Sequence, residues 1–393
     1  MYFCTMKIGF DAKRAAQNRT GLGNYSRYVL RILSEHMPEE ELHLFIPNPR
    51  KTDFLSEIPK TDVMKTHYPE GGLWKRLRSL WRVWGITKDI GRQNIDIFHG
   101  LSNELPLNIG RSGCRSVVTI HDLIFLHTPE YYKPIDRWIY NYKFRRACIN
   151  ADRVIAVSEY TRQDIIRHYG ISPDKIDVVY QGCDPAFAAP ISEDKLAEVK
   201  ARYSLPDRFI LYVGSIEKRK NLMLVAKAMT ESGNDTQVIA VGKHTPYTNE
   251  IRRYLHDNGR DDNIRFVHGV PFSDLPAFYR LASLFVYPSR IEGFGIPMLE
   301  AISSGVPAIG CTGSCLEEAG GSDCIYVDPD DVKGMADAIG RVMNDEALRK
   351  KMIDNGRKYS RRFNDEALCQ ELMNVYEHTA KSVRPQPCAR HAR

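Results

Sequence analysis

Short apolar runs alternate with amphipathic stretches along nearly the whole chain, and this alternation constrains the fold more than any other feature. Runs such as "SVVTIHD" (116–122) and "RFILYVGS" (208–215) have the length and β-branched content of strands that are buried on both faces. The run "KIGFD" (7–11) is followed by "NYSRYVLRILSEHM", which has helical periodicity. Alternating strands and helices predict an α/β fold with parallel sheets and right-handed crossovers. The other predicted strands lie at 152–158, 175–182, 236–243, 264–270, 284–289 and 306–310.

The length of the chain predicts two domains, because 393 residues exceed what one hydrophobic core usually organises. Residues 183–207 carry prolines and charges and have little strand character, so we expect a hinge there. The predicted fold has two doubly wound parallel-sheet domains, 1–187 and 188–365. Ligands are expected between them, beyond the carboxyl ends of the strands.

The amino-acid composition limits the classes of binding partner and the cellular compartment that we expect. The net charge of +6 indicates an anionic small ligand or an anionic membrane surface, and it is too small to indicate nucleic acid. The nine cysteines are odd in number and form no regular framework, which is typical of reduced thiols in a cytoplasmic protein. No secretory leader is visible, and no apolar run approaches the roughly 18 residues that span a bilayer.

The segment "EGFGIPMLE" places two acids, Glu292 and Glu300, around a turn that contains Gly293 and Gly295. Pro297 suits the start of a helix, and the N–H groups of a helix N-terminus form an anion site. Glu300 then leans back toward the same pocket as Glu292. An anion site between two carboxylates suits a pyrophosphate with a polyol on each side, that is, a nucleotide sugar. The alternative is that Glu300 only favours the helix dipole and Glu292 is a surface acid.

A second candidate segment, "GSIEKRKNL" (214–222), closes a predicted strand and opens a helix. Asn221 is a plausible N-cap, and Lys218, Arg219 and Lys220 would crowd the positive end of that helix. A bound polyanion makes such crowding favourable. A solvated basic turn is the alternative.

These motifs resemble the retaining glycosyltransferases of family 4, which have the GT-B fold. The resemblance covers nearly the whole chain and is strongest for the acid-x7-acid motif in "PSRIEGFGIPMLEAISSGVP". It also includes "YVGSIEKRKNL", "TIHDLIFLHTPEYY", "ADRVIAVSEYTRQDI", "VVYQGCDPAF" and "TGLGNYSRYVL", in the order of the family. Several of these are similar to mannosyltransferase-type bacterial members that build surface polysaccharides.

The resemblance implies two Rossmann-like domains that face each other across a cleft, with a C-terminal helix, 366–383, crossing back to the first domain. Glu300 would hold the donor ribose and Glu292 the donor sugar, while Arg219 and Lys220 would bind the diphosphate. His121 would stabilise charge on the sugar or orient it, with a purely structural histidine as the alternative. The other implied donor-binding positions are Gly21, Gly23, Gly214, Ser215, Val270, Gly293, Phe294, Gly295 and Ile296. Some members carry arginine in place of Ser215, so phosphate neutralisation would depend more on Arg219 and Lys220.

The implied reaction is transfer of a hexose, best matched by mannose from GDP-mannose, to a glycan or lipid-linked saccharide. No cofactor or metal is expected. The acidic segment "DPDD" (328–331) has the superficial form of a metal motif, but its place between a strand and a helix favours a turn and N-cap. A nucleotide-sugar epimerase or a non-catalytic nucleotide-sugar-binding subunit of the same fold remains an alternative. The Gly21-x-Gly23 segment matches a nicotinamide fingerprint poorly, because Ser26 stands where a third glycine is expected.

The stretch "LWKRLRSLWRVW" (73–84) contains three of the four tryptophans. As one helix it would gather Leu73, Leu77, Leu80, Trp81 and Trp84 near one face, with basic residues elsewhere. Such a helix can bind an anionic membrane, which suits a peripheral protein at the inner face of the membrane. A core-facing helix with a solvated basic back is the alternative.

Overall fold

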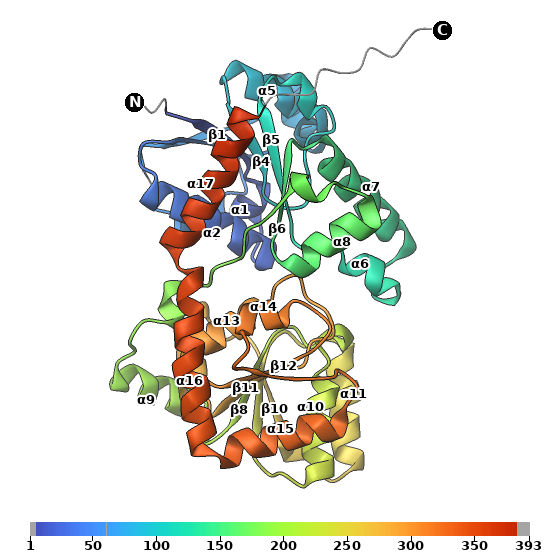
Figure 1. The fold of residues 1–393 in the computed structure, drawn as a ribbon, viewed down its shortest axis with the longest axis vertical. Coiled ribbons are helices and arrows are strands. Elements are labelled where there is room, and N and C mark those ends of the chain that lie inside the picture. The colour runs from blue at the N-terminus through green and yellow to red at the C-terminus, as the bar shows by residue number, and fades with distance from the viewer. Residues whose placement is uncertain (1–4, 60, 383–393) are drawn as a thin grey trace. The chain divides into compact units, whose positions relative to one another are not determined.

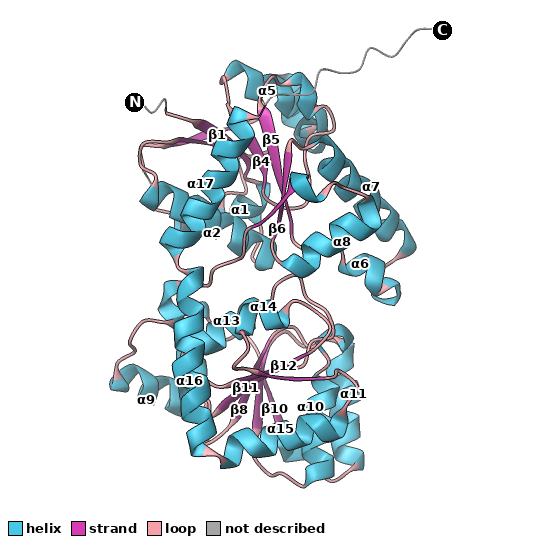
Figure 2. Ribbon diagram, viewed as in Figure 1, coloured by secondary structure: helices cyan, strands magenta, loops and turns pink. Residues whose placement is uncertain are grey.

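The structure is a computed structural model that describes residues 5–59 and 61–382, and it divides into two units. Unit 1 comprises residues 1–157, 162–179 and 365–393, and unit 2 comprises 158–161 and 180–364. Each unit contains one parallel sheet with helices packed on it (Figures 1 and 2). The predicted α/β class with two doubly wound domains is therefore confirmed.

The sheet of unit 1 has seven parallel strands in the order β3-β2-β1-β4-β5-β6-β7. Its inner strand β1 pairs on both sides, with Ile8 opposite Leu42 of β2 and Ile97 of β4. The strands are β1 Lys7–Asp11, β2 Glu41–Phe45, β3 Met64–His67, β4 Ile97–Gly100, β5 Arg115–Ile120, β6 Arg153–Ala156 and β7 Ile176–Val178. The helices are α1 Lys13–Gln17, α2 Gly21–His36, α3 Gly72–Arg76, α4 Arg78–Leu80, α5 Ile86–Arg92, α6 Ile124–His127, α7 Pro134–Asn150, α8 Glu159–Tyr169 and α17 Asp365–Lys381.

The sheet of unit 2 has six parallel strands in the order β10-β9-β8-β11-β12-β13. The order reverses at β8, so the loops after β8 and β11 leave neighbouring strands at the same edge, where ligands of such sheets bind. The strands are β8 Ile210–Val213, β9 Val238–Val241, β10 Ile264–Val267, β11 Leu284–Tyr287, β12 Ala308–Cys311 and β13 Ile325–Val327. The helices are α9 Glu193–Arg202, α10 Leu222–Ser232, α11 Pro246–Asp257, α12 Leu275–Leu281, α13 Ile296–Ser303, α14 Leu316–Gly320, α15 Val332–Asn344 and α16 Glu346–Ser360.

The last described helix, α17, packs in unit 1 against α2, β4 and β5, which lie far earlier in the sequence (Figure 1). The Tyr376 hydroxyl lies 2.7 Å from Nδ1 of His99 on β4, and both side chains are fully buried. At the start of α17, Asp365 pairs with Arg31 at 2.8 Å and accepts a hydrogen bond from Tyr28. Buried contacts and ion pairs therefore hold α17 on unit 1.

The boundary between the units differs from the predicted hinge. The chain leaves unit 1 after Val179, eight residues before the predicted boundary at 187, and residues 183–207 lie entirely in unit 2. They contain α9, which begins at an N-cap formed by Ser192 and packs against α12. Prolines and charges in this segment reflect a capped surface helix rather than a hinge.

The stretch 73–84 is not the continuous helix that the sequence predicted. Leu77 leaves helical geometry, with φ −98° and ψ 49°, and separates α3 from α4; a π-helical turn at Trp81–Gly85 follows. The tryptophans and leucines of this stretch therefore do not share one helical face. Trp81 is fully buried and donates to Asp89 at 2.7 Å, whereas Leu73 and Trp84 are 64% and 47% exposed.

Candidate active site

Glu292 is the centre of a buried polar cluster in unit 2, in the loop that follows β11. Its Oε1 atom accepts hydrogen bonds from Ser289 at 2.6 Å and from Tyr287 at 3.0 Å. The same oxygen contacts Lys220, which also contacts the Tyr287 hydroxyl, and it lies 3.1 Å from Nη1 of Arg219. The sequence-predicted residues Glu292, Lys220 and Arg219 are therefore in direct contact.

The cluster keeps Glu292 ionised although it is buried. Burial by itself opposes ionisation, but the positive charges of Lys220 and Arg219 and the hydrogen bond from Ser289 outweigh it and lower the pKa of Glu292 to about 2. Burial also lowers the pKa of Lys220, while Glu292 opposes that shift. Two cations share one carboxylate, so the site holds a net positive charge in unit 2, as a pyrophosphate would require.

The loop 292–295 leads directly into α13. Gly295 has φ +108° and precedes the first helical residue, Ile296; a Cβ atom there would lie 2.7 Å from the Leu316 side chain. Only glycine fits this conformation and this space. Pro297 occupies the first turn, as predicted, and Phe294 is buried against Tyr180 and Phe363. The anchored loop holds the backbone of Gly293 to Ile296 at the N-terminus of an eight-residue helix.

Glu300, at the fifth position of α13, has partners different from those of Glu292. Its Oε2 atom accepts a hydrogen bond from the Tyr279 hydroxyl at 2.7 Å. Burial, with a smaller effect of the charge on Asp184, raises the pKa of Glu300 to about 7 in spite of the bond from Tyr279. The two acids thus have opposite electrostatic environments, one in a cationic cluster and the other beside a neutral phenol.

A cavity of about 580 Å³ lies at the ends of β9 and β10 in unit 2. One wall is formed by residues 268–270, which include the implied donor-binding position Val270. His244 stands beside His268, with ring centroids 4.7 Å apart. The full lining is Val241, Gly242, Lys243, His244, His268, Gly269 and Val270.

The basic segment after β8 differs in detail from its prediction. Lys218–Lys220 form a short 3₁₀ turn, and Asn221 adopts a left-handed conformation, φ 57°, ahead of α10. Asn221 is not a side-chain N-cap: its amide donates instead to the carbonyl of Pro329 at 2.8 Å. The three cations have different surroundings, because Lys220 is buried with Glu292 while Lys218 is exposed and pairs with Glu250 at 3.2 Å.

Gly214 and Ser215 join β8 to this basic turn. Gly214 has φ +154°, and its carbonyl oxygen lies against Gly242, where a Cβ atom would come within 1.8 Å of it. The carbonyl of Ser215 accepts a hydrogen bond from Tyr212 at 3.0 Å. These contacts place the Gly214–Ser215 backbone beside the β9 end of the cavity.

His121 lies in unit 1, just after β5, and is almost fully buried. Its Nε2 atom is 2.9 Å from the carbonyl oxygen of Leu101, and its ring packs edge-on to Tyr25 at 4.5 Å. Burial lowers the pKa of His121 to about 4, so the imidazole is neutral near pH 7. A neutral, fixed ring fits both an orienting histidine and the purely structural alternative.

Gly21 and Gly23 belong to the first turn of α2 rather than to a loop. A Cβ atom at Gly23 would lie 1.9 Å from the backbone oxygen of Asn18, whereas one at Gly21 would meet no atom within 4 Å. Internal packing alone therefore requires glycine at position 23. Open space at Gly21 leaves room for a ligand to approach.

Sequence reasoning missed Tyr287, Ser289 and Tyr279, which hold the two acids. Tyr287 and Ser289 lie in the predicted strand 284–289. Their positions five and three residues before Glu292 are the signal that could have identified them. Asp331 is the N-cap of α15, accepting from Gly334 at 2.8 Å, as the turn and N-cap interpretation of "DPDD" predicted.

The structure defines an α/β protein with two parallel-sheet units and a buried cationic cluster in unit 2, and comparison with known proteins identifies its family. Residues 26–187 match the family model described as Glycosyltransferase Family 4, and residues 197–359 match Glycosyl transferases group 1. The chain belongs to the family 4 glycosyltransferases and has the GT-B fold.

Relatives and solved structures agree with this assignment. The chain is 28% identical to O-antigen chain mannosyltransferase B of Escherichia coli over 95% of its own length and all of the relative's. It is 29% identical to the serotype-specific mannosyltransferase WbdA of E. coli, matching 68% of this chain but only 34% of that protein. A structure of Anabaena HepE in complex with UDP and glucose superposes with a TM-score of 0.72 at 17% identity, over 95% of this chain and 100% of that one. WaaG, a glycosyltransferase of lipopolysaccharide biosynthesis, gives a TM-score of 0.66 at 14% identity, over 94% and 99%.

Proposed function

We propose that this protein transfers a hexose, mannose in the first instance, from a nucleoside-diphosphate sugar to a glycan or lipid-linked saccharide, with retention of anomeric configuration. The observation that carries the proposal is the cluster of Lys220, Arg219 and Glu292 beside the N-terminus of α13. The relatives named as O-antigen mannosyltransferases support mannose as the sugar and a surface polysaccharide as the product.

In the proposed reaction, the bond between the sugar C1 and the diphosphate oxygen breaks and the acceptor hydroxyl forms a new bond to C1 on the same face. The departing phosphate oxygen takes the acceptor proton. Lys220 and Arg219 stabilise the charge that develops on the diphosphate, an effect worth roughly 3–4 kcal/mol for one preorganised donor. Glu292 orients the sugar hydroxyls and keeps both cations in place.

Glu300 holds the ribose in this proposal, and the cavity at Val270 takes the base. His121 orients the sugar as a neutral imidazole. Protein cations supply the positive charge at the diphosphate, so we propose that transfer needs no metal cofactor. Turnover that persists in EDTA would support that part.

The decisive test incubates purified protein with GDP-mannose and a lipid-linked or mannose-terminated acceptor. We expect stoichiometric GDP and a glycan one mannose longer, with an α-linkage by NMR if the α-configured donor is retained. A β-linkage would contradict retention. UDP- and ADP-sugars serve as matched donors, and melting-temperature shifts with GDP, UDP and ADP rank the bases, because a bound ligand stabilises the folded state by mass action.

The same experiment separates the two alternative functions. An epimerised donor without an elongated glycan identifies a nucleotide-sugar epimerase. Tight donor binding without turnover, across all donors and acceptors tried, identifies a binding subunit. Free GDP without a longer glycan shows that the donor is hydrolysed and that the acceptor tested is not a substrate.

We also propose that the protein is cytoplasmic and contacts an anionic membrane peripherally. No helix in the described part of the chain is both long and apolar enough to cross a bilayer. Around the interrupted stretch 73–84, however, four large apolar side chains face solvent beside basic residues: Leu73 64%, Leu77 41%, Leu80 42% and Trp84 47% exposed. Exposed apolar groups next to Lys75, Arg76 and Arg78 have the chemistry that binds acidic lipid surfaces.

We expect the protein to float with vesicles that contain phosphatidylglycerol, and not with purely zwitterionic vesicles. Replacing Leu73 and Leu77 by glutamate together should abolish flotation, since both apolar contact and charge attraction are lost. The matched control is Phe272→Glu, which alters a 51% exposed apolar residue of unit 2. Unchanged flotation of the double variant would remove residues 73–84 as the contact.

A further inference from the structure

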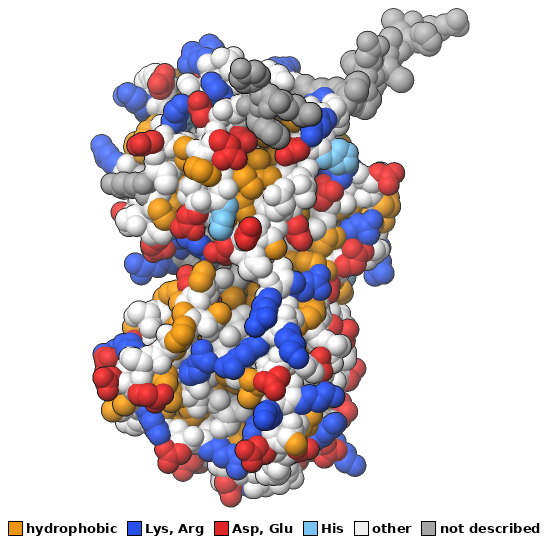
Figure 3. Space-filling view, turned by 60° about the vertical axis from the view of Figure 1, so that its left-hand side comes forward, with side chains coloured by type: hydrophobic (Ala, Val, Ile, Leu, Met, Phe, Trp, Pro, Cys, Tyr) orange, Lys and Arg blue, Asp and Glu red, His pale blue; other side chains and the backbone are white. Residues whose placement is uncertain are grey.

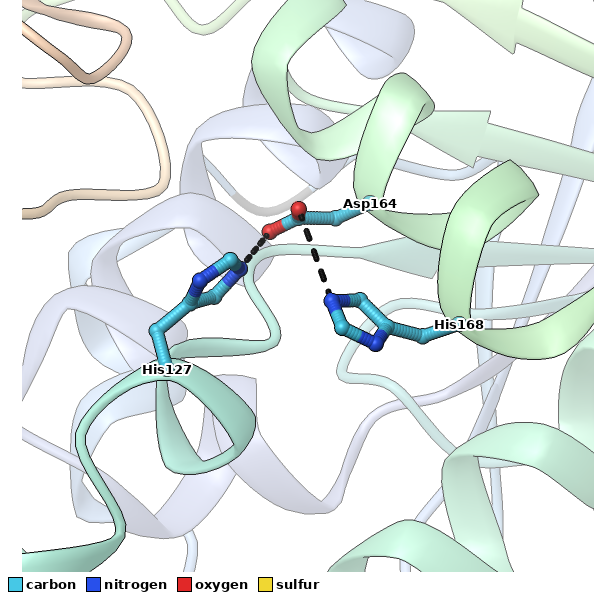
Figure 4. A group of neighbouring side chains, drawn as sticks. All are labelled: His127, Asp164 and His168. Atoms are coloured by element: carbon cyan, nitrogen blue, oxygen red, sulfur yellow. Dashed lines mark hydrogen bonds and ion pairs between the residues drawn. The ribbon is translucent and has the colours of Figure 1, made fainter.

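Three side chains in unit 1, outside the donor-binding residues, form a compact group (Figure 4). His127 ends α6, while Asp164 and His168 lie four residues apart on one face of α8. His127 Nε2 is 2.7 Å from Asp164 Oδ2, and His168 Nε2 is 3.9 Å from Asp164 Oδ1. One possible ligand atom from each of the three residues lies within 4.8 Å of the other two.

The carboxylate of Asp164 is only 6% exposed. Its ion-pair partners among residues 5–59 and 61–382 are the two histidines, and they include no lysine or arginine. A buried carboxylate is costly away from water unless hydrogen bonds or a positive charge compensate it. A bound divalent cation would neutralise it.

We propose that His127, Asp164 and His168 form a site for a divalent transition-metal ion of the Zn²⁺ type. Two imidazole nitrogens and one carboxylate oxygen are ligands that Zn²⁺ accepts, with a water molecule completing four-coordination. Zinc bonds of about 2.0–2.2 Å place tetrahedral ligand atoms about 3.3 Å apart. The observed separations of 2.7 and 3.9 Å lie on either side of that value.

The exposure of the group leaves a way in for the ion and room for the water ligand. The side chains of His127 and His168 are 24% and 32% exposed, whereas Asp164 forms the floor of the site. The two rings are nearly perpendicular, at 89°, and Figure 4 shows both turned toward the carboxylate. To bind, His127 would move its proton from Nε2 to Nδ1 and present the Nε2 lone pair.

The ion would join α6 to α8. The short helix α6 follows the segment 121–123 after β5, which begins with His121. Metal binding would therefore restrain the segment that carries His121 without placing the metal in the reaction. The proposal does not depend on the identity of the donor or acceptor.

The test uses tag-free, chelator-treated full-length protein with a phosphine reductant, and measures Zn²⁺ binding by equilibrium dialysis. We expect saturable Zn²⁺ binding by the wild type. The variant His168→Asn should bind one ion fewer per chain, or bind with an affinity weaker by at least about tenfold. That variant keeps the His127–Asp164 hydrogen bond, so it should fold normally. Co²⁺ should give the visible absorption bands of a four-coordinate ion in the wild type and not in the variant.

The matched control is His256→Asn, which removes an exposed histidine that also lies near an aspartate, Asp261 at 3.2 Å. His256→Asn should bind Zn²⁺ like the wild type. Zn²⁺ should raise the melting temperature of the wild type and of His256→Asn, but not that of His168→Asn. Absence of saturable binding, or equal binding by His168→Asn and wild type, would overturn the proposal. The three residues would then have a structural role, with the His127–Asp164 hydrogen bond joining α6 to α8.

Discussion

Replacing Lys220 by methionine is expected to lower kcat/KM for transfer by about two to three orders of magnitude. Methionine keeps much of the side-chain volume but removes the positive charge that would face the developing diphosphate. Glu292 keeps its contacts with Arg219, Tyr287 and Ser289, so the fold should survive. Steady-state release of nucleoside diphosphate measures the effect, and circular dichroism checks folding.

Lys218→Met is the matched control, because Lys218 lies two residues away but is exposed and paired with Glu250. It should retain near-normal activity. If both variants lose activity equally, general electrostatic attraction explains the loss rather than a diphosphate contact at Lys220. Near-normal transfer by Lys220→Met would refute the assignment.

Glu292 needs a gentler substitution than alanine. Deleting its carboxylate leaves Lys220 and Arg219 close together without their shared counter-charge, a change that typically destabilises a buried pair by about 3–5 kcal/mol. Glu292→Gln retains the shape and hydrogen-bonding capacity, and combining it with Lys220→Met removes the stranded charge. Both variants should fail in transfer, and the double variant should recover stability relative to Glu292→Gln.

Replacing Glu300 by glutamine is expected to weaken donor binding and at the same time stabilise unit 2 above pH 7. The pKa of Glu300 is raised from its ordinary 4.5 to about 7, so between these values the folded state binds more protons than the unfolded state. Stability from this group is therefore present at low pH and is lost as pH rises through 7. Glutamine avoids that loss, which should increase the free energy of unfolding at pH 8 by about 1–3 kcal/mol.

Thermal unfolding at pH 8 and at pH 4.5 measures the stability effect, which should vanish at the lower pH. Donor KM of the wild type should rise as pH falls below 7, because only the carboxylate accepts both ribose hydroxyls. Tyr279→Phe is the control: it removes the bond that lowers the pKa, so it should shift the KM profile to higher pH. A Glu300→Gln enzyme with unchanged donor KM would show that the acid is structural.

Sequence analysis identified strands that lie in apolar runs, such as β8 and β9. It missed β2, β3 and β4; of these, β2 and β4 contain His43 and His99 at fully buried positions. His43 pairs with His67 on β3 at 2.9 Å, and His99 pairs with Tyr376 and Thr119. Partners from distant segments make a buried polar residue acceptable, and no local pattern reveals them.

In the candidate site, too, local sequence motifs identified some features, whereas features that depend on distant partners were missed. The resemblance assigned Glu292, Lys220 and Arg219 to one donor site, and in the structure the loops after two neighbouring strand ends bring these side chains into contact. The side-chain role of Asn221 was wrong, since its amide reaches Pro329 more than a hundred residues away. The opposite environments of the two acids depend on hydrogen bonds from Tyr287, Ser289 and Tyr279. Tertiary packing orients these three side chains toward the carboxylates, so sequence spacing does not predict the bonds.

Lysine and arginine side chains gather on one face of unit 2, and Figure 3 shows this concentration. Long-range attraction of anionic donors by such a face should weaken with salt, as charge-steered association does.

The attachment of α17 to β4 has a consequence for biosynthesis. Unit 2 ends at Asn364, so all of its strands and helices have been made when the ribosome begins Asp365. Unit 1, although it starts the chain, still lacks the helix that covers His99 at that moment. The first lobe to be translated is thus the last to finish folding, and a released fragment that ends at residue 364 should already protect the second lobe from proteases.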